Sequence, residues 1–193
     1  MDESADKEEQ QPDDELQNLA AWYRHLVQEY PDDNVRFINS MREVLSGFQS
    51  LRFASDEDGT RKLWADFAAP KKRRASYAIS ELSEGQRCLL GLYMVLHFVI
   101  AKGKTVFIDE PDNFIALREI QPWLLAADSA VEDHKGQLII ISHHPELLNQ
   151  WAASYGLRFF REQNGNVRIE RLKLDPSFNL LPSELVARGW EDE

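Results

Sequence analysis

The sequence contains only one cysteine, Cys88, among its 193 residues. A single thiol cannot form an internal disulfide, which excludes the disulfide-stapled secreted class and is typical of proteins from a reducing cytosol. Long apolar runs are also missing, since the strongest, residues 89–101, contains His97 and is too short to span a bilayer. The first residues are acidic rather than basic, so no signal peptide is expected. These absences together predict a cytoplasmic protein with no membrane partner.

Net positive charge is lacking as well, because the formal net charge is -11. This argues against nucleic acid bound over the whole surface, but it leaves a local basic patch open. The opening fifteen residues hold eight acids and one lysine, and we expect residues 1–14 to form an acidic disordered tail. The opposite feature is the basic run 71–74, Lys-Lys-Arg-Arg. We interpret it as a polar turn between strands, with contacts to a phosphate backbone as the alternative.

Hydrophobic residues make up 43% of the chain, which predicts a globular fold. Residues 15–79 are expected to form a helical and hairpin portion, and residues 80–193 an α/β portion whose apolar strands form a mostly parallel sheet flanked by helices. The periodicity and turn signals predict, in chain order, helices 15–29 and 35–45, strands 49–54, 61–68 and 74–79, helix 83–101, strand 104–109, helix 114–131, strand 137–142, helix 145–153, and strands 157–161 and 167–172.

A phosphate-binding loop is also missing. Such a loop requires G-x-x-x-x-G-K-[ST] between a strand and a helix, so that backbone amides and the helix dipole surround the phosphates. Gly103-Lys104-Thr105 resembles its last three residues, but Phe98 stands at the position of the first glycine. A predicted helix precedes this segment and a predicted strand follows it. We therefore interpret it as the turn that starts a strand, and the chain as lacking a Walker A loop.

The segment Val106-Phe107-Ile108-Asp109-Glu110-Pro111 carries the most chemistry. Ligands bind at the C-terminal ends of buried parallel strands. Asp109 at that end can hold Mg²⁺, directly or through water, and Glu110 can orient and deprotonate an attacking water. An ordinary polar turn after a strand is the competing interpretation.

Upstream lies Leu82-Ser83-Glu84-Gly85-Gln86. Ser83 and Gln86 have the spacing of a capping box at a helix N-terminus. Gly85 is unexplained by capping, because glycine in a first turn costs about 1 kcal/mol relative to alanine. A glycine there lets a phosphate approach the helix N-terminus.

Downstream, an apolar strand ends in Ser142-His143-His144-Pro145. A histidine at a strand end is usually structural. Joint metal ligation by the two histidines is disfavoured, because neighbouring side chains on such a turn point apart.

The order of these three segments resembles the C-terminal half of an ABC-type ATPase. More narrowly, it is similar to the AAA-labelled ATPases of the DNA-repair and chromosome-maintenance branch, which includes RecF-like and SMC-like proteins. The resemblance covers about residues 16–188. It implies an ATP-hydrolysing P-loop fold with ATP and Mg²⁺ as cofactors. Ala116 departs from the family pattern, because an acid or a histidine is usual there.

The resemblance also implies a role for each residue. Asp109 would hold Mg²⁺ through water, Glu110 would polarise the attacking water, and His143 would sense the γ-phosphate. Ser83, Gly85 and Gln86 would contact the nucleotide of the opposite protomer in a head-to-tail dimer. A Walker A half, or a partner ATPase subunit, would supply the missing loop. By analogy with the family, DNA is a candidate partner.

Three hypotheses remain open on the sequence alone. The first is a partial ATPase that is inactive without its Walker A half. The second is a non-catalytic module that regulates a partner ATPase. The third is a metal-dependent nuclease or hydrolase that uses Asp109, Glu110, His143 and His144 without ATP.

Overall fold

The structure is a computed structural model that describes residues 1–55, 59–70, 73–111, 113, 115–161, 165–172 and 180–188. The chain divides into two compact units, Met1–Ile139 and Ile140–Glu193. Each unit is considered by itself below. The sequence suggested a boundary at residue 80, where the first motif begins, but the division between the compact units follows Ile139. Helices on both sides of residue 80 pack together within the first unit.

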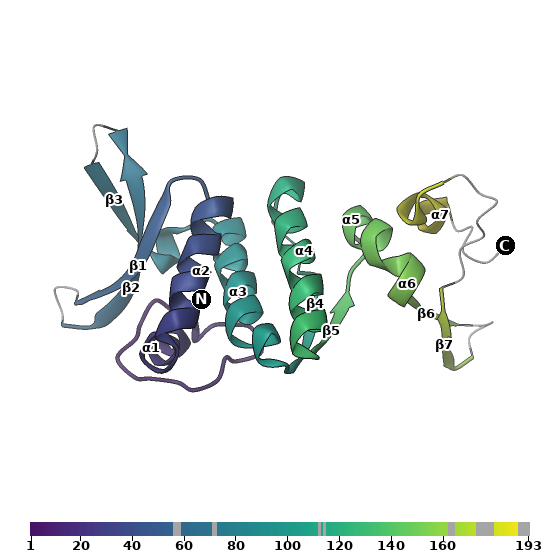
Figure 1. Ribbon diagram of the computed structural model, residues 1–193, viewed down its shortest axis with the longest axis horizontal. Helices are drawn as coiled ribbons and strands as arrows, with labels where there is room; N and C mark the ends of the chain where they lie inside the picture. Colours follow the sequence, from purple (N-terminus) through teal and green to yellow (C-terminus); the bar gives the residue numbers. More distant parts are fainter. Residues whose placement is uncertain are drawn as a thin grey trace. The chain divides into compact units, whose positions relative to one another are not determined.

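The first unit has two helices and then three strands before residue 80, and alternates helices with strands after it, as predicted; it is drawn from purple to green in Figure 1. Its elements are α1 (Leu19–Glu29), α2 (Pro31–Val44), β1 (Phe48–Ser55), β2 (Arg61–Ala69), β3 (Arg73–Ala78), η2 (Ile79–Glu81), α3 (Glu84–Phe98), η3 (Ile100–Lys102), β4 (Thr105–Asp109), α4 (Leu117–His134) and β5 (Gln137–Ile141).

Two helix starts differ from the predictions for local reasons. Helix α1 begins at Leu19 rather than at residue 15, because the Asp13 carboxylate accepts hydrogen bonds from the backbone amides of Glu15, Gln17 and Asn18. Such side-chain bonds compete with the helical ones. Helix α2 begins at Pro31 rather than at residue 35. Proline is favoured in a first helical turn, where its missing N–H would have no helical partner.

The strands β1, β2 and β3 form an antiparallel sheet in that order. One face of the sheet packs on the helices: the rings of Phe53 and Tyr23 are 5.8 Å apart, and those of Tyr23 and Phe37 are 5.9 Å apart. Phe37 also packs on Phe98 at the end of α3, with 5.9 Å between ring centroids. This aromatic cluster joins the sheet to α1, α2 and α3.

The acidic segment 1–14 was expected to be a disordered tail, but the structure describes it packed against the sheet. The Ala5 amide donates to the Arg61 carbonyl at 2.7 Å, and the Leu63 amide donates to the Glu3 carbonyl at 3.0 Å. Ala5 is completely buried. The physical reason is that β3 does not extend along the first residues of β2, so this edge has backbone groups that need partners.

The strands β4 and β5 form a separate two-stranded sheet, connected through α4. The Gln137 amide donates to the Lys104 carbonyl at 3.3 Å, so both strands start at the same end and run parallel. The parallel part of the fold is thus one strand pair within the described residues. On β4, the Phe107 side chain is 73% exposed, which leaves this face of the strand bare.

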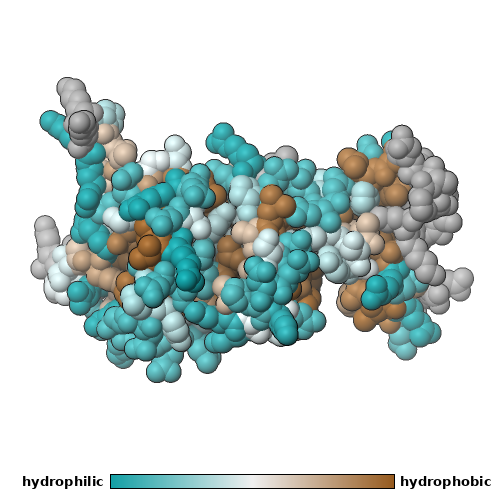
Figure 2. Space-filling model, in the orientation of Figure 1, coloured by the Kyte–Doolittle hydropathy of each residue, from teal (hydrophilic) through white to brown (hydrophobic). Residues whose placement is uncertain are grey.

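The second unit contains a short helical run and a hairpin (Figure 1). Its elements are α5 (Pro145–Leu147), the π-helix η4 (Leu148–Ala152), α6 (Ala153–Tyr155), β6 (Leu157–Arg161), β7 (Val167–Arg171) and α7 (Pro182–Arg188). The antiparallel pair β6–β7 confirms the predicted hairpin. One face of this hairpin carries four exposed apolar side chains: Leu157, Phe159, Val167 and Ile169. Hydrophobic colour gathers on this unit in Figure 2.

We expect the packing of α2 on α3 to be sensitive to acid through His97. Its Nε2 lies 2.9 Å from the Ser40 hydroxyl, and burial lowers the pKa of His97 to about 4 from an ordinary 6.5. Between those values the unfolded chain binds the additional proton, so stability is complete above pH 6.5 and is lost as the pH falls toward 4. In urea unfolding, His97→Gln should remove about 2 kcal/mol of the decline over this pH range. An equal decline in wild type and variant would contradict this assignment, and His134→Gln, at an exposed site, is the matched control.

Candidate nucleotide site

The C-terminal end of β4 carries the two predicted carboxylates. Asp109 is exposed and Glu110 is half-buried. Glu110 has a φ of +49°, in the left-handed region that non-glycine residues rarely adopt. The turn is closed by the Asn113 amide, which donates to the Glu110 carbonyl at 3.2 Å. A strained non-glycine residue of this kind costs about 1–3 kcal/mol, and such residues cluster at functional sites.

The capping box predicted at the start of α3 is present. The Gln86 amide donates to the Ser83 hydroxyl at 3.2 Å, and the Ser83 amide donates to the Gln86 side-chain oxygen at 3.0 Å. The Gln86 side chain therefore holds the cap together, and its carbonyl oxygen is already used for that purpose. Ser83 is exposed, and its O–H can still donate outward.

The first turn of α3 has the chemistry of an anion site. The capping box satisfies the amides of Ser83 and Gln86, while the amides of Glu84 and Gly85 bond to no other described residue and can donate at the helix N-terminus. Gly85 has no side chain to obstruct an approach to these amides. Two free amides, a hydroxyl and the positive end of a helix dipole fit the oxygens of a phosphate.

Helix α3 and the turn after β4 are in contact. The Cys88 thiol donates to the Pro111 carbonyl at 3.6 Å, and Pro111 is buried. Ser83 lies five residues earlier on the helix, so about 7.5 Å further along its axis. The first turn of α3 therefore lies about two helical turns from this contact. The sequence placed Cys88 near the core without revealing this contact.

Gly103-Lys104-Thr105 forms the turn expected for it. Gly103 ends η3 with a φ of +70°, and Thr105 is the first residue of β4. A Cβ atom on Gly103 would lie 2.6 Å from the His134 carbonyl oxygen, so glycine is required here by close backbone packing as well as by φ. The order of helix, glycine and strand is the reverse of a phosphate-binding loop.

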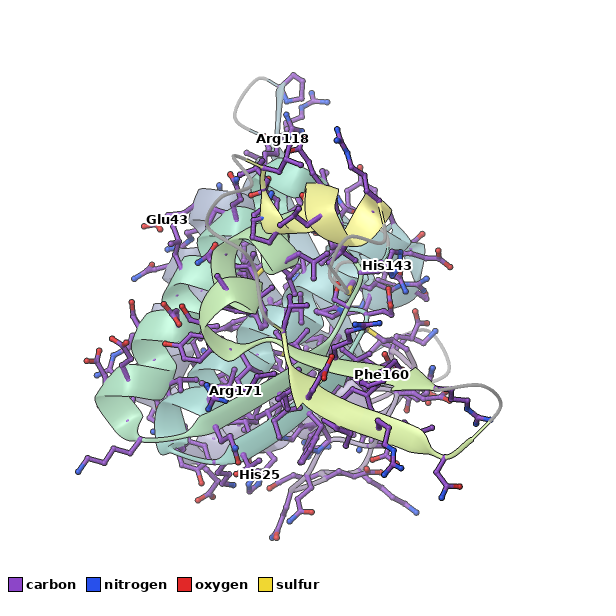
Figure 3. The ribbon with its side chains drawn as sticks, turned by 90° about the vertical axis from the view of Figure 1, so that its right-hand side faces the viewer. His25, Glu43, Arg118, His143, Phe160 and Arg171 are labelled. Carbon is purple, nitrogen blue, oxygen red and sulfur yellow. The ribbon has the colours of Figure 1, made fainter. Side chains whose placement is uncertain are left out.

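Both histidines belong to the second unit, and His143 is labelled in Figure 3. His143 is exposed. His144 caps α5: its Nδ1 accepts a hydrogen bond from the Glu146 amide at 3.2 Å. This use of His144 removes it from joint ligation with His143.

The donor set suits magnesium bound together with a nucleotide better than a metal bound by protein alone. No cluster of three or more His, Cys, Asp or Glu side chains able to hold a metal ion occurs within the described ranges. The metal-dependent hydrolase hypothesis therefore has no support among these residues. Mg²⁺ usually takes one or two carboxylates, water and substrate phosphates, and the exposed Asp109 carboxylate fits that role.

Sequence reasoning missed the backbone conformation at Glu110. The available signal was Pro111, because a residue that precedes proline is excluded from much of the right-handed helical region. That rule restricts Glu110, but it does not by itself select the left-handed region.

A parallel β4–α4–β5 unit with carboxylates after its first strand is the arrangement of α/β nucleotide-binding proteins. Residues 13–149, more than half of the chain, match the family described as AAA domain, putative AbiEii toxin, Type IV TA system. The chain belongs to this family of AAA ATPases.

A solved structure supports the same fold. It comes from a study described as "Structural biochemistry of ATP-driven dimerization and DNA stimulated activation of SMC ATPases". The alignment has a TM-score of 0.50 and 14% sequence identity, and covers 88% of this chain and 95% of that chain. At this identity the similarity concerns the fold. No curated protein matches the sequence, and no helix in the described part of the chain is long and apolar enough to cross a membrane.

Substitutions at Glu110 should separate backbone strain from side-chain chemistry. Glycine adopts a positive φ without strain, so Glu110→Gly should leave the free energy of unfolding unchanged or raise it by up to about 1 kcal/mol. Glu110→Gln keeps the strain and should stay within about 0.5 kcal/mol of wild type. Urea unfolding measures both. A glycine variant clearly less stable than the glutamine variant would show that the left-handed conformation carries no strain.

The N-terminus of α4 should be open to stabilisation. Ala116 is its N-cap and has no side-chain acceptor, although the Glu119 carboxylate accepts from the Ala116 amide at 3.4 Å. Ala116→Ser completes this capping box and should raise the free energy of unfolding by about 1 kcal/mol. Ala130→Ser, inside the same helix, should lower it by about 0.5 kcal/mol. If both serines had the same effect in thermal unfolding, the cap would not be formed.

Proposed function

We propose that this chain is the signature and Walker B portion of an ATP-hydrolysing ABC-type ATPase. The observation that carries the proposal is the strained Glu110, which follows Asp109 at the end of β4 and lies next to the turn that α3 contacts through Cys88 and Pro111. Strain at a carboxylate that follows the end of β4 has no structural benefit evident among the described residues. It is accounted for if the carboxylate must point at a reacting water.

Each residue has a distinct role in this proposal. Phosphoryl transfer needs positioning and charge stabilisation more than covalent chemistry. Mg²⁺ would neutralise charge on the nucleotide phosphates. Asp109 holds the water shell of that ion, Glu110 orients and deprotonates the attacking water, and His143 donates to the γ-phosphate.

The free amides of α3 serve a second molecule in the proposal. Ser83 and Gly85 donate to the γ-phosphate held by the opposite protomer, so that the site closes in a head-to-tail dimer. The capping box, which orders this turn while leaving the Ser83 hydroxyl able to donate outward, supports the arrangement.

The phosphate cradle must come from elsewhere. None of the 193 residues forms a G-x-x-x-x-G-K-[ST] loop. We infer that a Walker A lobe, in the same polypeptide or in a partner subunit, completes the site, and that residues 1–193 alone are inactive. The exposed Phe107 on β4 supports this, because parallel sheets are normally covered on both faces.

The test is phosphate release from Mg-ATP. The chain would be assayed alone and after tagged capture of a Walker A polypeptide from its native host in the presence of ATP. We expect background release from the chain alone and measurable release from the complex. Glu110→Gln should lower the rate of the complex at least 10²-fold while ATP stays bound. Glu132→Gln, at an exposed site on α4, should leave the rate unchanged.

The results also separate the alternatives. Normal hydrolysis by the isolated chain would overturn the inference that it is partial. A complex that keeps its full rate with Glu110→Gln would favour the non-catalytic regulator. The feature that supports this alternative is Ala116, which stands where the family usually has an acid or a histidine and gives α4 no side-chain cap.

A further inference from the structure

A groove lies between the helices α1 and α2 and the strand β1, which follows α2 in the chain and packs against it (Figure 1). Its volume is about 320 Å³, near the lower end of the range of about 300–1,000 Å³ for ligand clefts, so it suits one or two side chains better than a large cofactor. Five apolar side chains form its walls: Val27, Val35, Ile38, Leu51 and Phe53. Val35 is 59% exposed, so the groove is open to solvent on this side. We call it the β1 groove.

The polar side chains of the β1 groove offer hydrogen-bond donors. The Tyr23 hydroxyl donates to the Asn34 side-chain oxygen at 2.7 Å, and Arg42 Nη1 donates to the Asn39 side-chain oxygen at 3.2 Å. Both amide oxygens are therefore occupied, and each asparagine keeps its N–H groups for a ligand. The two asparagines are five residues apart, about 7.5 Å along α2, which is close to the roughly 6.6 Å between alternate residues of an extended chain. This lining therefore fits the carbonyl oxygens of an extended peptide.

One end of the groove carries a positive charge. Arg42 is the only charged side chain among the described residues that line it. Its Nε donates to the Gln49 carbonyl at 2.8 Å, so the guanidinium is ordered beside the start of β1, while Nη2 stays available to a ligand. A carboxylate can meet such an ordered guanidinium with little loss of conformational entropy. A cation beside an apolar groove, on a chain whose net charge is -11, favours an acidic partner.

Strand β1 also has an unpaired edge. It is an end strand in the order β1-β2-β3, and no described segment pairs with its outer side. Because Arg42 satisfies the Gln49 carbonyl, the open edge runs over residues 50–55. Every second residue of this edge directs its N–H and C=O outward, where they can pair with an added strand. Leu51 and Phe53 of the same segment line the groove, so a chain on this edge can place side chains in it.

The same sheet already accepts an extended segment at another edge. Ser4 forms an antiparallel bridge with Lys62 of β2, and the Ala5 amide donates to the Arg61 carbonyl at 2.7 Å. Ala5 is completely buried there. A few extended residues are therefore enough to cover an edge of this sheet and to bury a side chain.

We propose that β1 binds an extended segment of a partner polypeptide, which pairs with residues 50–55 and places an apolar side chain in the β1 groove. In strand addition of this kind, main-chain hydrogen bonds supply affinity and pockets for alternate side chains supply specificity. A small molecule would fill the groove without using the open edge. The binding involves neither the carboxylates after β4 nor a nucleotide, so it goes beyond the proposed ATPase function and can fail separately from it.

The charge of Arg42 specifies the bound segment further. Antiparallel addition continues the pattern of the sheet, and it brings the C-terminal end of the segment to the start of β1, beside Arg42. Residues two apart in a strand share a face. The segment should therefore carry Asp or Glu two residues after its apolar residue.

The first experiment measures fluorescence anisotropy of the fluorescein-labelled peptide Lys-Thr-Val-Thr-Leu-Thr-Glu-Thr-Lys titrated with the full chain. We expect saturable binding. Val35→Glu adds a like charge to the groove wall and should weaken binding at least tenfold, and Arg42→Gln should weaken it at least threefold. Two matched controls should change the affinity less than twofold: Leu125→Glu, at a 62% exposed site on α4, and Arg36→Gln, on α2 but outside the lining.

Backbone pairing is tested on the peptide, which leaves the protein unchanged. One peptide carries an N-methyl group on its leucine amide, and a second carries it on the threonine amide that follows. Adjacent amides point to opposite edges of a strand, so only one of the two peptides should lose binding. In hydrogen exchange followed by NMR, the unmethylated peptide should slow the exchange of alternate amides within residues 50–55 at least fivefold.

Several outcomes would overturn the proposal. These are the absence of saturable binding, equal binding by both methylated peptides, or unchanged exchange at residues 50–55. Binding that survives both Val35→Glu and Arg42→Gln would show that the peptide sits elsewhere. Self-association of the free chain that Val35→Glu abolishes would overturn the choice of partner in favour of a second copy of the chain.

Discussion

The position of helix α3 is the constraint on which the rest of the first unit depends. It packs against α2 on one side and α4 on the other, and most of its last three turns are buried. The indole N–H of the fully buried Trp123 on α4 donates to the Leu92 carbonyl of α3 at 3.0 Å. A buried tryptophan with its N–H satisfied combines a large apolar contact with one directional bond, so it fixes the helices laterally and lengthwise. Because α3 begins with the turn that carries Ser83 and Gly85, and α4 follows Asp109 and Glu110, this contact sets the spacing of the two halves of the candidate site.

Close backbone packing supplies the second part of the framework. Gly103 and Gly136 lie where the starts of β4 and β5 meet, and a Cβ atom on either would come within about 3 Å of a carbonyl oxygen. Their small size lets the two strands and the end of α4 approach closely. The strained Glu110 stands at the opposite end of β4, where such a rigid surrounding can hold a conformation that the residue alone disfavours. The close packing around Gly103 at the start of β4 therefore helps to hold the strained conformation of Glu110 at its end.

Much of this arrangement could be predicted from the sequence, because it is local. The capping box at Ser83 and Gln86, the hairpin around the β6–β7 turn and the strand that follows Gly103 each depend on a few neighbouring residues. The misses depend on distant partners. The packing of the acidic segment requires the open edge of β2, and the partners of Asp66 come from both neighbouring strands, β1 and β3. A charged residue within the apolar strand 61–69 was nonetheless a readable signal, since a buried carboxylate needs cations.

The uneven distribution of charge and apolar surface gives these observations a common interpretation. Acidic side chains dominate the chain, yet Arg52 and Arg74 concentrate positive charge around one buried carboxylate, that of Asp66. Apolar side chains are buried throughout the helical core, yet Phe107 on β4 and, in the second unit, one face of the β6–β7 hairpin remain exposed. A stable fold does not need either feature, and exposed apolar faces lower solubility. The exposed apolar faces are accounted for if the chain acts in contact with a complementary polypeptide at these strand surfaces, and the ordered arginines around Asp66 keep the charged part of the sheet apart from that contact.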